Sequence, residues 1–238
     1  MFCQQWKGTS QHPIRSRSFP ILNWVIIILN VIVFFFQANL PAGGMERFVN
    51  DFALIPARVD LSQPITLIPF FTHMWLHGSL FHIISNMWML VIFGDNIEDR
   101  MGSLRYLIFY ILGGIAAGVL QYIFTINPNI PAVGASGAIA AVLGAYFLFF
   151  PRSRVVTFVP IFLFGWFVNV PSFIFLGLWF GSQLLSGVSE LALAASADMS
   201  GVAWWAHIGG FLFGLLMANI FTIGKKPRRN YRDEYYPW

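Results

Sequence analysis

Six long apolar segments dominate this sequence, and each has about the length of a helix that crosses a lipid bilayer. The segments are Phe19–Phe36, Leu80–Phe93, Leu104–Thr125, Ser136–Phe150, Pro171–Gly187 and Val202–Ile223. A hydrocarbon core of about 30 Å needs about 20 helical residues. Only 10% of the 238 residues are charged and 57% are hydrophobic, whereas soluble proteins carry about 25% charged residues. We therefore predict an all-α membrane protein, a bundle of six transmembrane helices embedded in the lipid bilayer.

The basic residues predict the orientation of the chain. Of the 14 Lys and Arg, 12 fall on the side of the N-terminus and two, Arg47 and Arg58, fall on the opposite side. Cytoplasmic loops carry such an excess of positive charge, so both termini are expected in the cytoplasm and the protein in the cell (plasma or inner) membrane. This bias also explains the net charge of +4, and no nucleic-acid partner is expected. The sequence does not determine the oligomeric state.

The expected organisation is a cytoplasmic segment at 1–18, a membrane domain at 19–223 and a basic cytoplasmic tail at 224–238. Prolines and a glycine interrupt the apolar stretch Val155–Val170, which we therefore expect in the membrane interface or in a re-entrant loop. The outer loop Gln37–Phe70 is long for a helix connection, and its aromatic and proline content predicts that it lies on the membrane. A single cysteine, Cys3, excludes an internal disulfide.

The spans lack the charged residues that several classes of membrane protein need. Arg105, at an inner end, is their only ionised residue, which argues against an ion-coupled transporter and a paired-aspartate protease. His73 and His77 have the spacing of a zinc-binding helix, but Met74 stands where that motif has glutamate. We expect no metal and no cofactor. Loop imidazoles bonded to backbone carbonyls explain the two histidines, and a metal site there is the alternative.

The polar residues that stand out within the expected spans are His82, Asn86, Ser136 and His207. Each by itself has an ordinary explanation as helix packing or interhelical hydrogen bonding. Their depths nevertheless match. The segment Ser136–Phe150 is about 22 Å long at about 1.5 Å per residue, so it ends about 8 Å below the outer edge of the bilayer core. We expect a similar depth, about 5–10 Å below that edge, for His207. The same depth holds for His82 and Asn86 if Ser79 caps their helix.

Stripes of small residues indicate how two of these spans meet. Small residues recur every four positions on the short fourth span and on the last one: Ser136, Ala140 and Gly144, and Ala206, Gly210, Gly214 and Ala218. Two such faces can pack backbone against backbone. That packing would bring the Ser136 hydroxyl within reach of the His207 imidazole.

A serine hydroxyl beside an imidazole has a chemical use, because the imidazole can take the proton that otherwise keeps the hydroxyl a weak nucleophile. No carboxylate is placed to orient His207, so the pair would be a dyad and not a triad. The developing oxyanion needs fixed donors. The Ser136 amide at a helix N-terminus, the Asn86 side chain and an N–H of His82 can supply them.

At these residues the sequence resembles the rhomboid family of intramembrane serine proteases. The resemblance covers about Thr72–Leu216 and rests on four motifs in order: His82-x-x-x-Asn86, Glu98-x-x-x-Gly102, Gly134-Ala135-Ser136-Gly137 and Ala206-His207-x-x-Gly210. It implies a serine endopeptidase that cleaves transmembrane segments of other membrane proteins near the outer face. It implies Ser136 as the nucleophile, His207 as the general base, and His82 and Asn86 in the oxyanion hole.

The resemblance also implies structural roles for a further set of residues: His77, Glu98, Gly102, Gly134, Gly137 and Gly210. By the same resemblance, the fifth span is a lateral gate and the following loop its cap, and the aromatic residues of that span suit a helix that faces lipid. Two positions depart from the family pattern. Ile68-Pro69 replaces a Trp-Arg pair of the first outer loop, and Ala140 replaces an aromatic residue that stacks on the histidine.

Two other functions are compatible with parts of this pattern. A catalytically silent rhomboid-like protein would keep the fold and bind transmembrane clients without cleaving them. A small-molecule channel or transporter would work without Ser136, although the spans offer it no intramembrane carboxylate.

Overall fold

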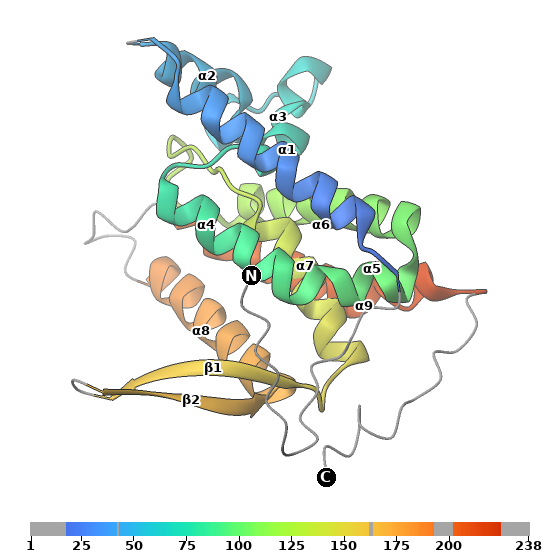
Figure 1. The fold of residues 1–238 in the computed structure, drawn as a ribbon. Coiled ribbons are helices and arrows are strands. Elements are labelled where there is room, and N and C mark those ends of the chain that lie inside the picture. Colours follow the sequence, from blue (N-terminus) through green and yellow to red (C-terminus); the bar gives the residue numbers. More distant parts are fainter. Residues whose placement is uncertain (1–17, 42, 162–163, 193–201, 225–238) are drawn as a thin grey trace.

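The chain folds into a bundle of helices with a β-hairpin at one side (Figure 1). The computed structural model describes residues 18–41, 43–161, 164–192 and 202–224. Its longer helices are α1 (Ile21–Ala38), α4 (Leu80–Met89), the π-helical turn Leu90–Gly94, α5 (Asp95–Met101), α6 (Ser103–Phe124), α7 (Ser136–Phe149), α8 (Ser172–Ala192) and α9 (Trp204–Met217). The expected cytoplasmic segment 1–18 and tail 224–238 lie, but for one residue each, outside the described residues.

The outer loop between α1 and α4 contains short helices. They are α2 (Gly44–Phe52), α3 (Pro69–Thr72) and the 3-10 turns Pro56–Arg58, Pro64–Leu67 and His73–Trp75. Proline stands at the first position of several of these pieces, where its missing N–H has no helical partner to lose.

Four of the described helical segments are long and apolar enough to cross a membrane: Ile21–Ala38, Leu80–Met101, Ser103–Phe124 and Ser172–Ala192. The helices α7 and α9 are apolar but shorter, with 14 residues each. The predominantly helical membrane fold and the short fourth helix are thus confirmed. The expected number of six crossings stays a prediction, because it depends on these two short helices.

The last helix is shorter than the sequence predicted. We expected a span over Val202–Ile223, but α9 ends at Met217, and a 3-10 turn over Ile220–Thr222 follows. The Arg105 guanidinium at the start of α6 donates to the carbonyl oxygens of Phe221 at 3.2 Å and Ile223 at 2.7 Å. These side-chain bonds satisfy two carbonyl groups beyond the end of α9.

The stretch Val155–Val170 forms an antiparallel β-hairpin, in which β1 (Arg154–Ile161) pairs with β2 (Phe164–Pro171). We expected this stretch in the membrane interface or in a re-entrant loop, which stays a prediction, and we did not predict strands. Valine, threonine and phenylalanine favour strands, and pairing satisfies the backbone groups that an irregular loop would leave open. Phe158 and Phe167 face each other in the register with their rings 5.3 Å apart.

Helix α7 lies at the centre of the bundle and packs against α6 and α9. All of its residues from Gly137 to Tyr146 are buried, and most of them are Gly, Ala or Val. Their small side chains allow the neighbouring helices to approach closely. A Cβ atom at Gly113 of α6 would collide with the Ala141 side chain of α7.

Helix α8 touches the bundle along one stripe and exposes the rest of its surface. Its buried residues are Ser172, Leu176, Gln183 and Gly187, while Leu178 is 72% exposed. The aromatic residues that we expected to face lipid divide between the two faces. Phe173 is exposed, but Trp179 and Phe180 lie against Phe211 of α9. Figure 1 shows α8 and the hairpin side by side, apart from α1 and α4.

Candidate active site

Ser136 and His207 are hydrogen-bonded to each other, with 2.9 Å between Ser136 Oγ and His207 Nε2. Ser136 is the first residue of α7, and His207 lies in the first turn of α9. Both side chains are half-buried. The sequence analysis predicted that these groups, which are 71 positions apart, would meet.

The two helices come together along the small residues that the sequence analysis singled out. A Cβ atom at Gly210 would collide with the carbonyl oxygen of Gly137, and one at Gly214 with the carbonyl oxygen of Ala141. In return, a Cβ atom at Gly144 would collide with the Phe211 carbonyl oxygen. Backbone-to-backbone packing over two turns therefore fixes the position of Ser136 relative to His207.

His82 lies on α4, close to the turn that leads into Ser136. The N-cap Ser79 accepts a hydrogen bond from the His82 backbone N–H at 3.1 Å, so the helix begins where the sequence predicted. The His82 ring borders Gly134, where a Cβ atom would lie 2.7 Å from the ring and 3.6 Å from Ser136 Oγ. Gly134 has φ +124°, a conformation that glycine adopts far more readily than other residues.

Asn86 lies one turn after His82 on the same helix and is 6% exposed. Its side-chain nitrogen Nδ2 is buried and has no hydrogen-bond partner in the described part of the chain. A buried donor without a partner costs about 1–3 kcal/mol.

His77 is fully buried, and its ring lies edge-on to the His82 ring with 5.1 Å between centroids. Its backbone N–H donates to Gln37 at the end of α1, at 3.1 Å. His77 thus packs against the His82 ring. The His73 ring bonds to the Pro69 carbonyl at 2.9 Å, as expected for a loop imidazole. No cluster of three or more potential metal ligands occurs among the described residues.

Backbone hydrogen bonds anchor the outer loop that lacks the Trp-Arg pair. Leu54 and Ala132 exchange two bonds of 3.1 Å and 2.8 Å, which tie this loop to the loop that precedes Ser136. The Gly134 N–H donates to the His73 carbonyl at 2.9 Å. Main-chain hydrogen bonds from the outer loop therefore fix the segment of chain that leads into Ser136.

Glu98 lies at the far end of the second span and is 2% exposed. Its carboxylate accepts from the backbone N–H groups of Leu22 at 3.1 Å and Asn23 at 2.7 Å, and from the Ser103 hydroxyl at 2.6 Å. It thereby caps the N-terminus of α1 and joins it to α6. Gly102, with φ +82°, makes the turn between α5 and α6.

Two glutamines that the sequence analysis did not single out also touch this region. Gln183 of α8 is 6% exposed, and its Oε1 lies 2.7 Å from His207 Nδ1. Gln121 of α6 accepts from the Ala206 N–H at 3.1 Å, a donor in the first turn of α9 that also bonds to the Ala203 carbonyl oxygen at 3.1 Å. Both are lone amides inside apolar spans, and that signal could have identified them.

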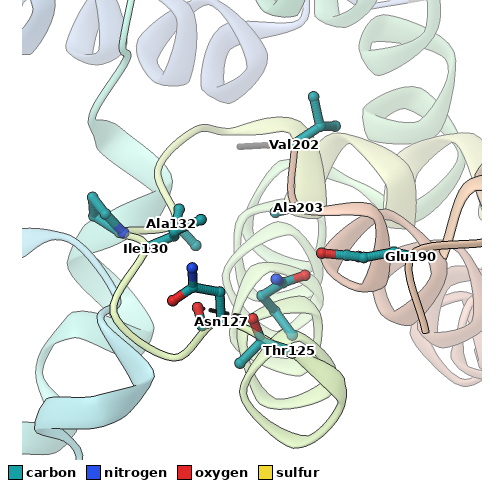
Figure 2. A pocket seen from close by; sticks show the side chains of 9 residues that line it. Thr125, Asn127, Ile130, Ala132, Glu190, Val202 and Ala203 are labelled. Carbon is teal, nitrogen blue, oxygen red and sulfur yellow. Dashed lines mark hydrogen bonds between the residues drawn. The ribbon is translucent and has the colours of Figure 1, made fainter. Parts of the chain in front are cut away.

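A small pocket that is open to solvent lies beside the N-terminus of α9. Figure 2 shows Glu190 pointing into it from α8, opposite Ile130 and Ala132 of the loop before Ser136. Gln121, Thr125 and Asn127 give one side a polar lining. The pocket thus lies next to the helix turn that carries His207.

A family model described as the Rhomboid domain matches residues 64–223, which include all the predicted site residues. The chain belongs to the rhomboid family. Its relatives include RHOMBOID-like protein 1 of Arabidopsis thaliana, with 27% identity over 91% of this chain and 56% of the relative. The presenilin-associated rhomboid-like protein, mitochondrial, of Homo sapiens is 28% identical over 80% of this chain and 45% of the relative. This rhomboid spans about half the length of the curated relatives it matches.

Proposed function

We propose that this rhomboid is an intramembrane serine endopeptidase that cleaves transmembrane segments of other membrane proteins near the outer face. The observation that carries the proposal is the hydrogen bond of 2.9 Å between Ser136 Oγ and His207 Nε2. A nucleophile and a base within hydrogen-bond reach are what activation of a serine hydroxyl requires.

In the proposed reaction, Ser136 Oγ attacks the carbonyl carbon of the scissile bond while its proton passes to His207 Nε2. The tetrahedral intermediate collapses, the C–N bond breaks, and the proton moves from Nε2 to the departing nitrogen. Water then attacks the acyl-serine ester while His207 Nε2 takes one of its protons. The ester C–O bond breaks, Nε2 returns that proton to Ser136 Oγ, and the acid product and free Ser136 are released.

The oxyanion of each intermediate needs preorganised donors. The unpartnered Nδ2 of Asn86, the ring of His82 and the Ser136 N–H at the start of α7 are the donors we propose. His77, Glu98, Gly102, Gly134, Gly137 and Gly210 would keep these groups in place without touching substrate.

The expected substrate is a single transmembrane segment with a weak helix. Intact helical hydrogen bonds cover the backbone carbonyls, so the segment must unwind before Ser136 can attack. We therefore expect substrates with Gly, Pro or other helix breakers and a small residue at the cleavage site. The open pocket of Figure 2 offers space for water next to α9.

We further propose that the protein resides in a cell (plasma or inner) membrane with both termini in the cytoplasm, on the basis of its basic-residue bias. Alkaline phosphatase, which is active only outside the cytoplasm, tests this. A fusion after Asp60 should be active and one at Gly224 inactive. The reverse pattern would contradict the orientation.

The enzymatic test uses the full chain in detergent and a tagged single-span substrate. Ser136→Ala and His207→Ala should each lower the cleavage rate by about 10³-fold or more. Ser62→Ala, at an exposed serine of the outer loop, is the matched control and should cleave like the parent. A fluorophosphonate should label the parent at Ser136. Absence of both cleavage and labelling would instead favour a silent protein that binds transmembrane clients.

A further inference from the structure

Both ring nitrogens of His207 have a hydrogen-bond partner. One partner is the Ser136 hydroxyl and the other is a side-chain amide. Ser136 Oγ lies 2.9 Å from Nε2, and Gln183 Oε1 lies 2.7 Å from Nδ1. A neutral imidazole carries one proton, so one ring nitrogen donates and the other accepts. General-base chemistry at Ser136 needs the form in which Nδ1 carries the proton and Nε2 is free to accept.

The neighbours of Gln183 determine which end of its amide faces His207. Gln183 Nε2 lies 3.3 Å from the Trp179 carbonyl oxygen and 2.9 Å from the Ser182 hydroxyl. The Ser182 hydroxyl itself donates to the Trp179 carbonyl at 2.6 Å. A carbonyl can only accept, so a flipped amide would set two oxygens against each other. The NH₂ group therefore belongs on the Trp179 side and Oε1 on the His207 side.

From this arrangement, we propose that Gln183 is a positioning residue that holds His207 in the Nδ1–H form and turns its Nε2 towards Ser136. The proposal rests on the proposed protease function. Because Oε1 only accepts, the bond requires the proton on Nδ1. A serine triad uses a carboxylate for this purpose. An amide does so without a buried charge, which would be costly inside a membrane.

Aromatic contacts alone do not determine which ring nitrogen of His207 carries the proton. Trp179 and Trp204 lie 5.8 Å and 6.3 Å from the His207 ring, centroid to centroid. They restrict the tilt of the ring but present no acceptor to Nδ1. Ala140, which stands at the position where an aromatic residue is expected, adds no ring contact. Gln183 is thus the described side chain that distinguishes the two nitrogens of His207 by a hydrogen bond.

The position of Gln183 also links the proposed general base, His207, to the packing of α8. This helix meets the bundle along a narrow buried stripe, and Gln183 is part of it. If α8 moved away from α9, Oε1 would leave Nδ1, and the selection of the competent form would be lost. The dyad is therefore complete only while α8 is docked on α9.

The test compares Gln183→Met and Gln183→Glu with the parent in the cleavage assay, in detergent and over a range of pH. Methionine fills a similar volume but accepts no such bond. Gln183→Met should lower kcat by about 10-fold to 100-fold, since bonds to charged groups contribute about 1.5–3 kcal/mol, and leave KM nearly unchanged. Leu184→Met on the same helix is the control and should cleave like the parent.

Gln183→Glu restores an acceptor and adds a negative charge. It should recover most of the lost kcat and move the acid limb of the pH–activity profile to higher pH, because the carboxylate stabilises the protonated ring. His82 of α4 is the other titratable side chain in the described chain whose charge acts on His207, and it is unchanged in all variants.

The outcomes separate this proposal from the proposed function. If Gln183→Met cleaves at the parental rate, or if Gln183→Glu leaves the pH profile unchanged, Gln183 only fills space and the positioning role is wrong. If Ser136→Ala cleaves like the parent, the protease function itself is wrong. Thermal unfolding of each variant in detergent identifies a loss of rate that comes from unfolding.

Discussion

Gly210 of α9 lies so close to Gly137 of α7 that a Cβ atom at Gly210 would collide with the Gly137 carbonyl oxygen. The contact occurs one residue after Ser136 and three residues after His207. It therefore sets how closely the two helix ends approach, and with it the hydrogen bond of 2.9 Å between the two side chains.

Gly210→Ala should destabilise the protein by about 1–3 kcal/mol, because the added methyl group forces the two backbones apart. The cleavage rate should fall further than the loss of folded protein explains. Gly181→Ala is the matched control, since a Cβ atom at this position of α8 meets no atom of the described residues within 4 Å. Unfolding in detergent and the cleavage rate measure both effects. Equal stability of the two variants would contradict close packing at Gly210.

Gly134→Ala tests the link between the loop before Ser136 and His82. Alanine at φ +124° is strained by about 1–3 kcal/mol, and its Cβ atom would lie 2.7 Å from the His82 ring. We expect kcat to fall even when the variant is folded. Gly43→Ala, at φ +78°, carries backbone strain without the clash, because its Cβ atom meets none of the described atoms within 4 Å. It should lose stability and keep kcat; a similar kcat in both variants would exclude a role for the His82 contact.

Glu98→Gln should lower the free energy of unfolding by about 1.5–3 kcal/mol, since hydrogen bonds to a charged acceptor contribute that much. Gln retains one of the two oxygens that accept from Leu22, Asn23 and Ser103. At temperatures below the unfolding midpoint of the variant, kcat should be unchanged, because Glu98 acts at the N-terminus of α1 and not at Ser136. Glu46→Gln, in the exposed first turn of α2, should cost less than about 1 kcal/mol. If the two variants lost the same free energy of unfolding, the proposed capping role of Glu98 would be wrong.

Much of the site was predictable because its signals are local or periodic. The Ser79 cap is a local hydrogen bond, and the stripes of small residues on α7 and α9 follow from the helical repeat. The short length of α7 follows from the length of its apolar segment. These features do not depend on how the remaining helices are rotated about their own axes.

Gln183 and the β-hairpin were not predicted, for different reasons. Whether Gln183 reaches His207 depends on the rotation of α8 about its own axis, which the packing of Trp179 and Phe180 on Phe211 determines. In the hairpin, both faces of the strands are apolar, so no period of two is visible in the sequence.

Asn86→Leu is expected to separate stability from activity. The buried Nδ2 of Asn86 has no partner among the described residues, so leucine, of similar volume, should leave stability unchanged or raise it by about 1–3 kcal/mol. Loss of an oxyanion donor should at the same time lower kcat by about 10²–10³-fold. Met87→Leu, at the next buried position of α4, controls for repacking. Fluorophosphonate labelling and thermal unfolding, measured beside kcat, report the nucleophile and the fold. A destabilised Asn86→Leu with parental kcat would mean that Asn86 holds the helices together and does not face the oxyanion.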